Sequence, residues 1–126
     1  MASRLIVGVV ADTHGLVRPE AIEALRGSDV ILHAGDIGGN HVLKELGGVP
    51  VLVLHDRALL GLEPSEEGLG AVVFGHSHQP LAEKRKGVLW FNPGSAGPRR
   101  FRLPVSVGRL VIEDGRVRTR LLALDV

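Results

Sequence analysis

The sequence predicts an α/β fold, and three observations lead to this class. Short continuous runs of Val, Ile and Leu recur along the chain, as expected for strands that are buried on both faces. Segments with helical character lie between the early runs, whereas the later runs are joined by hairpin signals. The length of 126 residues fits one compact domain, so residues 1–126 are expected to form a single domain.

Seven segments have the composition of strands. They cover residues 5–11, 29–35, 49–55, 70–76, 87–94, 104–113 and 116–124. The last two flank Asp114-Gly115, a pair typical of two-residue hairpin turns, and the sequence around Gly87 resembles a second hairpin. We therefore expect a βαβαβ beginning, with parallel strands and helices packed on them, followed by an antiparallel end.

Two segments are predicted to be helical. Residues 18–27 place Pro19 in the first turn and Gly27 at the end. Residues 40–48 place Asn40 at the N-cap, His41 in an exposed first turn and a Gly-Gly pair at the end. A third segment, residues 58–70, is ambiguous because Pro64 interrupts it.

The composition bears on the cellular compartment of the protein and on whether it crosses a membrane. It contains no cysteine, which excludes disulfides and thiolate metal ligands and fits the reducing cytoplasm. The first apolar run, Leu5 to Ala11, is too short to cross a membrane. We therefore expect a cytoplasmic protein with no membrane partner.

Charge is distributed unevenly along the chain. Residues 1–79 carry five Lys/Arg against ten Asp/Glu, whereas residues 80–126 carry ten against four. The basic half has two interpretations: solvated strand edges, or a rim that attracts phosphate-bearing ligands. Nucleic acid is not favoured as a partner, because stacking aromatic side chains are nearly absent.

Polar side chains end four successive predicted strands. They are Asp12, His14, Asp36, His55, His76 and His78. Ligands of open α/β sheets bind beyond the carboxyl ends of the strands, and oxygen and imidazole donors suit first-row divalent metals. Side chains two residues apart on a strand point the same way, so Asp12 should align with His14, and His76 with His78. The pattern predicts a metal site.

These residues also carry a resemblance to a known family. "DTHG" at 12–15, "HAGD" at 33–36, a strand-end His55, "GHSHQP" at 75–80 and "NPGS" at 92–95 occur in this order before the closing hairpin. In this respect the chain resembles the calcineurin-like metallophosphoesterases, in particular the small bacterial and archaeal phosphodiesterases of the YfcE type. The resemblance covers nearly the whole chain and implies a two-sheet α/β sandwich flanked by helices, with a two-metal site at the strand ends.

The resemblance assigns a role to each residue. Asp12, His14 and His78 would hold one divalent metal, His55 and His76 the other, and Asp36 would bridge both. The two ions (Mn, Ni, Fe, Co or Zn) would clamp a phosphate ester, and a metal-bridging hydroxide would attack phosphorus, with catalytic roles for Asp36, His55 and His76. Asn92 and Ser95 would support the ligands; the alternative is that they form a turn after the fifth strand.

One family motif does not occur at its usual position. The family has Gly-Asn-x-Asp or Gly-Asn-His-Glu at the end of a strand after the Gly-Asp segment, and its Asn ligates the second metal. We therefore expect a fold shortened by about one strand and a cap segment. His55 either is the family's strand-end ligand or ends the strand that lost its Gly-Asn; both alignments put it near the second metal.

Asn40 lies in "GNH", only four residues after Asp36. We interpret it as a helix N-cap rather than a metal ligand. The alternative is that Asn40 or Asp56 fills the vacant position at the second metal. His33 is expected to be buried and hydrogen-bonded, outside the ligand set.

The expected function is therefore divalent-metal-dependent hydrolysis of a small phosphate ester, specifically a phosphodiester. The alternative is a degenerate, non-catalytic member of the fold that acts as a metal-stabilised binding or scaffold protein, by analogy with the retromer subunit of this fold. The retention of the Asp and His residues favours the enzyme. A sheet edge bared by the missing strand could pair with a second copy, which leaves a homo-oligomer open.

Overall fold

The structure is a computed structural model that describes residues 4–16, 18–35, 41–99 and 102–126. Within these ranges the elements are, in chain order, β1 (Arg4–Val10), α1 (Pro19–Ala24), β2 (Val30–His33), β3 (His41–Leu46), β4 (Val49–Leu54), the 3-10 helix η1 (Arg57–Leu59), β5 (Ala71–Val73), β6 (Leu81–Arg85), β7 (Val88–Asn92), β8 (Ser106–Glu113) and β9 (Arg116–Ala123). No helix in these segments is long and apolar enough to cross a membrane.

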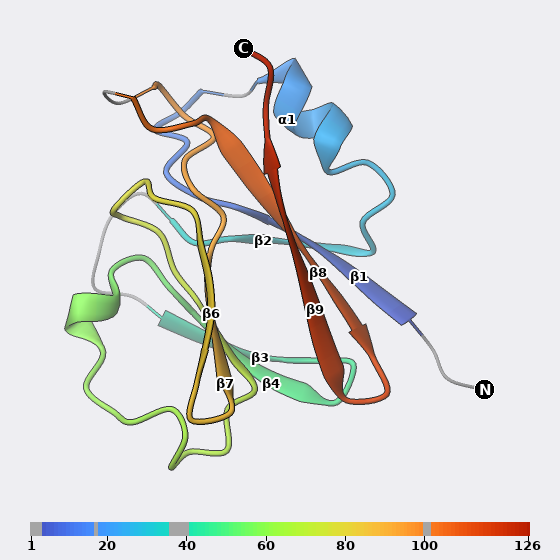
Figure 1. Cartoon of the computed structure of the whole chain (residues 1–126), viewed down its shortest axis with the longest axis vertical. Helices are drawn as coiled ribbons and strands as arrows, with labels where there is room; N and C mark the ends of the chain where they lie inside the picture. The colour runs from blue at the N-terminus through green and yellow to red at the C-terminus, as the bar shows by residue number, and fades with distance from the viewer. Residues whose placement is uncertain (1–3, 17, 36–40, 100–101) are drawn as a thin grey trace.

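The strands form two mixed sheets that pack face to face (Figure 1). The first sheet has the order β2-β1-β8-β9, in which β1 pairs parallel with β2 and antiparallel with β8. The second has the order β3-β4-β5-β7-β6, and its three central strands are parallel. The predicted α/β class and two-sheet sandwich are confirmed. The parallel pairs, however, are divided between two sheets rather than gathered in one.

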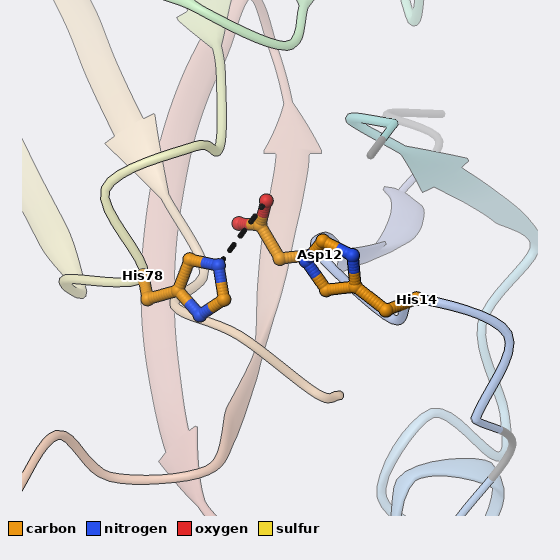
Figure 2. Close-up of side chains that lie close together, drawn as sticks. All are labelled: Asp12, His14 and His78. Carbon is orange, nitrogen blue, oxygen red and sulfur yellow. Dashed lines mark ion pairs between the residues drawn. The ribbon is translucent and has the colours of Figure 1, made fainter. Parts of the chain in front are cut away.

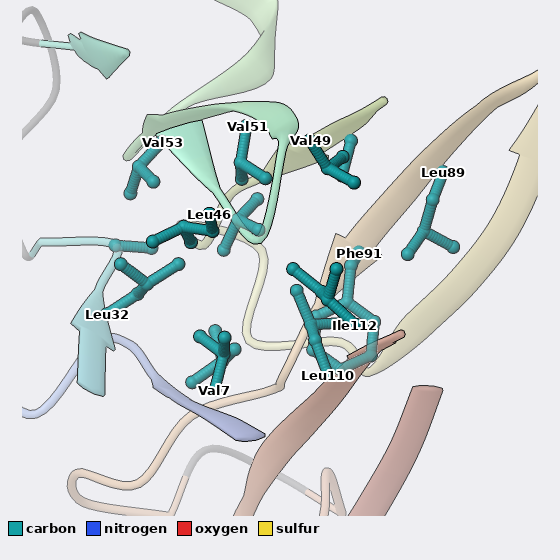
Figure 3. Close-up of a cluster of buried hydrophobic side chains, with 14 of the residues drawn as sticks. Val7, Leu32, Leu46, Val49, Val51, Val53, Leu89, Phe91, Leu110 and Ile112 are labelled. Carbon is teal, nitrogen blue, oxygen red and sulfur yellow. The ribbon is translucent and has the colours of Figure 1, made fainter. Parts of the chain in front are cut away.

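The main core lies between the two sheets (Figure 3). Alternate residues of β1 and β8, such as Val7 and Leu110, face alternate residues of β4 and β7, such as Val51 and Phe91. The period of two is that of strands with one face in the core. Burial of these apolar side chains holds together the strand ends that carry the polar residues.

The outer face of the first sheet packs against α1. Pro19 begins this helix and Leu25 forms its C-cap, so the helix predicted over 18–27 exists but is shorter. Ala21 and Leu25 contact Val10 and Val107 of the sheet in a second apolar cluster. The Arg109 guanidinium donates 2.8 Å to the carbonyl of Ala24, which satisfies an acceptor at the end of the helix.

The helix predicted over residues 40–48 is not formed; this prediction is wrong for residues 41–46. They form β3, paired antiparallel with β4, and Gly47-Gly48 is the two-residue turn between them. Both glycines have positive φ, 57° and 80°, as a type I′ hairpin turn requires. A Gly-Gly pair is a signal for a hairpin turn as well as for the end of a helix. Asn40 lies outside the described residues.

The two hairpins predicted near the end of the chain are present. Asp114 and Gly115 both have positive φ between β8 and β9, and Lys86 and Gly87 do so between β6 and β7. Turns of this kind match the right-handed twist of the flanking strands. Here the local sequence signal was sufficient.

Candidate metal centre

The candidate centre lies where the carboxyl ends of β1, β4 and β5 meet. β1 ends at Val10 and β5 ends at Val73, so the polar residues follow the strands rather than lie on them. Four of them have positive φ: Asp12 54°, His14 51°, His76 73° and His78 63°. The prediction that these residues lie on extended strands, with Asp12 aligned with His14 and His76 with His78, is therefore wrong about the backbone. Left-handed turns direct these side chains instead.

Asp12 is the centre of the arrangement. Its side chain is fully buried, and its carboxylate oxygens accept the backbone N–H of His76 at 3.2 and 3.0 Å. Oδ1 lies 3.7 Å from Nε2 of His55 and 3.7 Å from Nε2 of His78. A buried carboxylate is unfavourable unless positive or hydrogen-bonding partners surround it, and the backbone N–H of His76 supplies one such partner.

Asp12, His14 and His78 form a group suited to a metal ion (Figure 2). One ligand atom of each residue lies within 4.8 Å of the others, and the rings of His14 and His78 stack with centroids 5.6 Å apart. Asp12 and His78 are buried, whereas His14 is exposed. One carboxylate and two imidazoles fit a first-row divalent ion, and the exposed member leaves a side open for a ligand.

His55 and His76 lie on the other side of Asp12. The Nδ1 of His55 donates to the carbonyl of Ala34 at 3.2 Å, and Nε2 on the other side of the ring lies 3.7 Å from Oδ1 of Asp12. The rings of His55 and His76 meet edge to face at 5.2 Å. Nε2 of His76 also lies 3.8 Å from Oδ2 of Asp56. The structure thus places three further donors beside the first group.

Asn92 and Ser95 contact the loops that carry these residues. The Asn92 amide donates 3.2 Å to both the carbonyl of Gly75 and Oγ of Ser77, and its oxygen accepts the N–H of Gly94. Ser95 Oγ donates 3.1 Å to the carbonyl of Asp12. Both side chains are buried. They therefore form a turn and contact the backbone of the candidate ligands at the same time.

Two glycines were missed by the sequence reasoning. A Cβ at Gly97 would lie 2.2 Å from the carbonyl oxygen of Asp12, and one at Gly75 would lie 2.9 Å from its Oδ2. These positions allow the loops after β5 and β7 to approach Asp12. The glycines stand in "GHSH" and "GSAG", but nothing local in the sequence shows which backbone they would contact.

Two candidate residues, Asp36 and Asn40, lie outside the described residues. The prediction that His33 is buried is wrong. Its side chain is exposed at the end of β2. It is hydrogen-bonded as expected: Nδ1 accepts the N–H of Gly35 at 2.8 Å, and Nε2 lies 3.0 Å from Oγ1 of Thr13.

An apolar hollow of about 540 Å³ adjoins the loop after β1. Thr13 and Gly15, on either side of His14, form part of its wall, with Ile22 of α1 and Ile31 of β2. Ile22 and Ile31 are more than half exposed there. The hollow is large enough for a small organic group next to the candidate metal ligands.

Comparison with known proteins finds a family match for more than half of the chain. Residues 39–115 match the model of the calcineurin-like phosphoesterase superfamily domain. A probable metallophosphoesterase of Methanothermobacter thermautotrophicus is 26% identical over 132 residues, covering 72% of this chain and 77% of the relative.

Solved structures share the fold at lower sequence identity. An archaeal phosphodiesterase superposes with a TM-score of 0.75 at 18% identity, covering 94% of this chain and all of the other. A predicted phosphoesterase of Streptococcus pneumoniae gives 0.74 at 22% identity, covering 96% and 90%. Vacuolar protein sorting 29 of Cryptosporidium parvum gives 0.71 at 14% identity, covering 97% of each chain.

Proposed function

Because the chain belongs to the calcineurin-like phosphoesterase superfamily, we propose that it is a metal-dependent hydrolase of phosphate esters, specifically a phosphodiesterase. The observation that carries the proposal is the group formed by buried Asp12 with His14 and His78. A buried carboxylate among imidazoles at the ends of strands is costly unless it binds something positive. Within the described part of the chain, the ion-pair partners of Asp12 are His55 and His78, and neither Lys nor Arg is among them.

The proposed cofactor is a pair of divalent ions, chosen from Mn, Ni, Fe, Co and Zn. Asp12, His14 and His78 would hold the first ion, and His55 and His76 the second; Asp36 would bridge them. Such ions, when bound, would neutralise charge on the phosphate and lower the pKa of a shared water. The protein's own part is to orient the ligands. The carbonyl of Ala34 fixes the ring of His55, and the backbone N–H of His76 holds the carboxylate of Asp12.

The proposed substrate is a small phosphodiester. Exposed His14 and His76 leave the site open to solvent, and the apolar hollow beside Thr13 could hold one organic group of the ester. The structural likeness to an archaeal phosphodiesterase favours the same choice.

We infer that residues 1–126 act as one domain in the cytoplasm, a compartment that fits a chain without cysteine.

The test is hydrolysis of bis-p-nitrophenyl phosphate, compared with the monoester p-nitrophenyl phosphate, after Mn²⁺ loading. Asp12→Asn and His78→Ala should each lower kcat/KM by more than about 100-fold, because loss of a ligand should exceed the effect of losing a group that only orients one. Asp125→Asn, an exposed position near the chain end, is the matched control and should retain activity.

The alternative is a non-catalytic binding protein that keeps the fold. Its support is the structural similarity to vacuolar protein sorting 29. If the wild-type chain binds metal but hydrolyses neither ester above the Asp12→Asn background, the hydrolase proposal fails and the binding protein is the better description.

A further inference from the structure

We propose that the open edge of β9 binds an extended acidic segment of another protein, which adds to the first sheet as a further strand. This inference is independent of the proposed hydrolase function. β9 ends the strand order β2-β1-β8-β9, so within the described chain it pairs on one side alone, with β8. The other side of an edge strand presents backbone donors and acceptors that an extended peptide can use.

β9 lacks the features that usually block pairing at a sheet edge, which are short length, proline and bulges. It is the longest of the four edge strands in the described sheets, with eight residues against four in β2, six in β3 and five in β6. It contains no proline, and each of its residues has one partner on β8 in unbroken register. β9 therefore offers a long and regular edge for strand addition.

The hydrogen-bond register identifies the backbone groups at this edge. The N–H of Leu124 donates 2.8 Å to the carbonyl of Val105, in line with the register of β8 and β9. In an antiparallel pair every second residue makes such bonds. Even-numbered residues of β9 therefore bond to β8, whereas odd-numbered residues direct their N–H and C=O to the open edge. These are Val117, Thr119, Leu121 and Ala123.

Three arginines occupy alternate positions along β9. Arg116, Arg118 and Arg120 are all exposed. Side chains two residues apart on a strand point the same way, so the three share one face of the sheet. It is the face opposite to that of Val117, which packs against the main core. Arg116, next to the turn, lies opposite Glu113 on β8. The other two form the uncompensated part of this row.

Arg118 and Arg120 have no carboxylate partner on β8. Arg118 lies opposite Val111, and Arg120 lies directly opposite Arg109. Like charges directly opposite each other destabilise a sheet. In the described part of the chain the arginines that form ion pairs are Arg4, Arg26 and Arg85. The edge therefore carries positive charge that a negative partner would balance.

The spacing of the arginines matches an acidic strand. A strand added beside β9 places alternate side chains next to them, so Asp or Glu at every second position would form cross-strand pairs of opposite charge. The intervening side chains would lie beside Thr119 and Leu121, of which Leu121 is 37% exposed. Apolar or β-branched residues suit those positions. The expected partner is thus a segment in which acidic residues alternate with residues such as Val.

A second copy of this chain fits the same edge poorly. Antiparallel pairing about a two-fold axis keeps the same face of both β9 strands on one side of the joined sheet. The arginines of one copy would then face those of the other, and like charges at opposite positions oppose pairing. The row of arginines therefore hinders self-association but permits an acidic strand.

The test is the binding of a fluorescein-labelled peptide, as long as β9, in which Glu alternates with Val. Fluorescence anisotropy gives its affinity. The control peptide has the same composition with its Glu residues contiguous. We expect the wild-type chain to bind the alternating peptide more tightly than the control peptide, and to bind it less tightly at high salt, because exposed charges are screened.

Two variants separate the backbone from the charge. Thr119→Pro removes an N–H that faces the open edge and spares the bonds to β8, a position that proline tolerates in edge strands; affinity should fall by about tenfold or more. Arg118→Gln with Arg120→Gln keeps the edge and removes two charges, which should weaken binding by about tenfold. Lys84→Gln with Lys86→Gln is the matched control, because it removes two exposed charges at the β6–β7 hairpin of the other sheet. It should bind as wild type.

Thermal unfolding checks that each variant is folded, and the arginine variant keeps the test decisive if Thr119→Pro folds poorly. Hydrolysis of bis-p-nitrophenyl phosphate should be unchanged in the arginine variant, so failure here leaves the hydrolase proposal standing. No binding of the alternating peptide by the wild type, or wild-type affinity in either folded variant, would overturn the proposal. Equal binding of the contiguous-Glu peptide or of oligothymidylate would replace strand addition by a general polyanion surface. A wild-type dimer that Thr119→Pro dissociates would assign the edge to a second copy instead.

Discussion

The surroundings of Asp12 are formed by residues that lie far apart in the sequence. Its carboxylate contacts groups from residues 55, 76 and 78, and its carbonyl accepts a bond from Ser95. Asp12, His14, His76 and His78 all adopt left-handed backbone angles, which cost non-glycine residues about 1–3 kcal/mol each. Strain of this size concentrated in four candidate ligands indicates that these positions serve binding rather than stability.

Gly97→Ala should weaken metal binding without removing a ligand. The added Cβ would lie 2.2 Å from the Asp12 carbonyl and 2.7 Å from that of Thr13, so the backbone of the metal loop must move. We expect the affinity for Mn²⁺ to fall by about tenfold and the free energy of unfolding to fall by about 1–3 kcal/mol. Calorimetric titration and urea denaturation measure the two effects.

The control for this prediction is Gly61→Ala, where a Cβ would meet nothing within 4 Å. It should leave Mn²⁺ affinity unchanged. Equal Mn²⁺ affinity in Gly97→Ala and wild type would show that the loop after β7 does not position Asp12.

The ligand types were evident from the sequence, but their geometry was not. His55, His76 and Asp12 were identified because Asp and His residues follow apolar runs, a signal confined to a few neighbouring positions. Their orientation depends on left-handed turns and on Gly97, which is 85 residues away from Asp12 (97 − 12). Contacts over such separations leave no periodic pattern, so single-sequence reasoning could not place them.

The β3–β4 hairpin is the element that sequence reasoning misassigned. In "HVLKELGG", Val42, Leu43 and Leu46 fit the spacing of a helix, and Glu and Lys are good helix formers. The structure pairs these residues with β4 through six registered positions, and pairing across a sheet overrides local propensity. The short strands rich in Val and Ile and the Asp-Gly hairpin were predicted correctly, because β-branched residues favour strands and the Asp-Gly pair favours a hairpin turn.

Gly47 and Gly48 provide the test of this hairpin. Both have positive φ, so alanine at either should cost about 1–2 kcal/mol of unfolding free energy. At Gly47 the Cβ would also lie 2.9 Å from Cγ2 of Ile112 on the opposite sheet, whereas at Gly48 it would meet open space. Gly47→Ala should therefore be the more destabilising by up to about 1 kcal/mol, measured by urea denaturation.

Gly48→Ala is the matched control, since it changes the same turn without the contact. Equal losses for the two variants would contradict the packing of this turn against β8. An increase in stability for either would contradict the left-handed turn itself.

At the scale of the whole molecule, the candidate centre joins the two sheets. Asp12 and His14 follow β1 of the first sheet, whereas His55, His76 and His78 follow β4 and β5 of the second. The sandwich class was predictable because buried strands must cover their apolar faces. Which strand joins which sheet was not predictable, because the runs of residues 5–11 and 49–55 are both short, apolar and rich in Val.

Metal binding should therefore stabilise the fold as a whole, because the bound ions would hold the two sheets together at one end. An ion at 100 times its Kd that binds only the folded chain adds about 2.7 kcal/mol to the free energy of unfolding. For a chain of this length that gain raises Tm by roughly 10 °C. The measurement is thermal unfolding after EDTA treatment, with and without added Mn²⁺. Asp12→Asn should lose most of the rise, because its carboxylate is buried between the sheets and contacts imidazoles of the second. A rise of equal size in Asp12→Asn and wild type would place the bound Mn²⁺ elsewhere on the molecule.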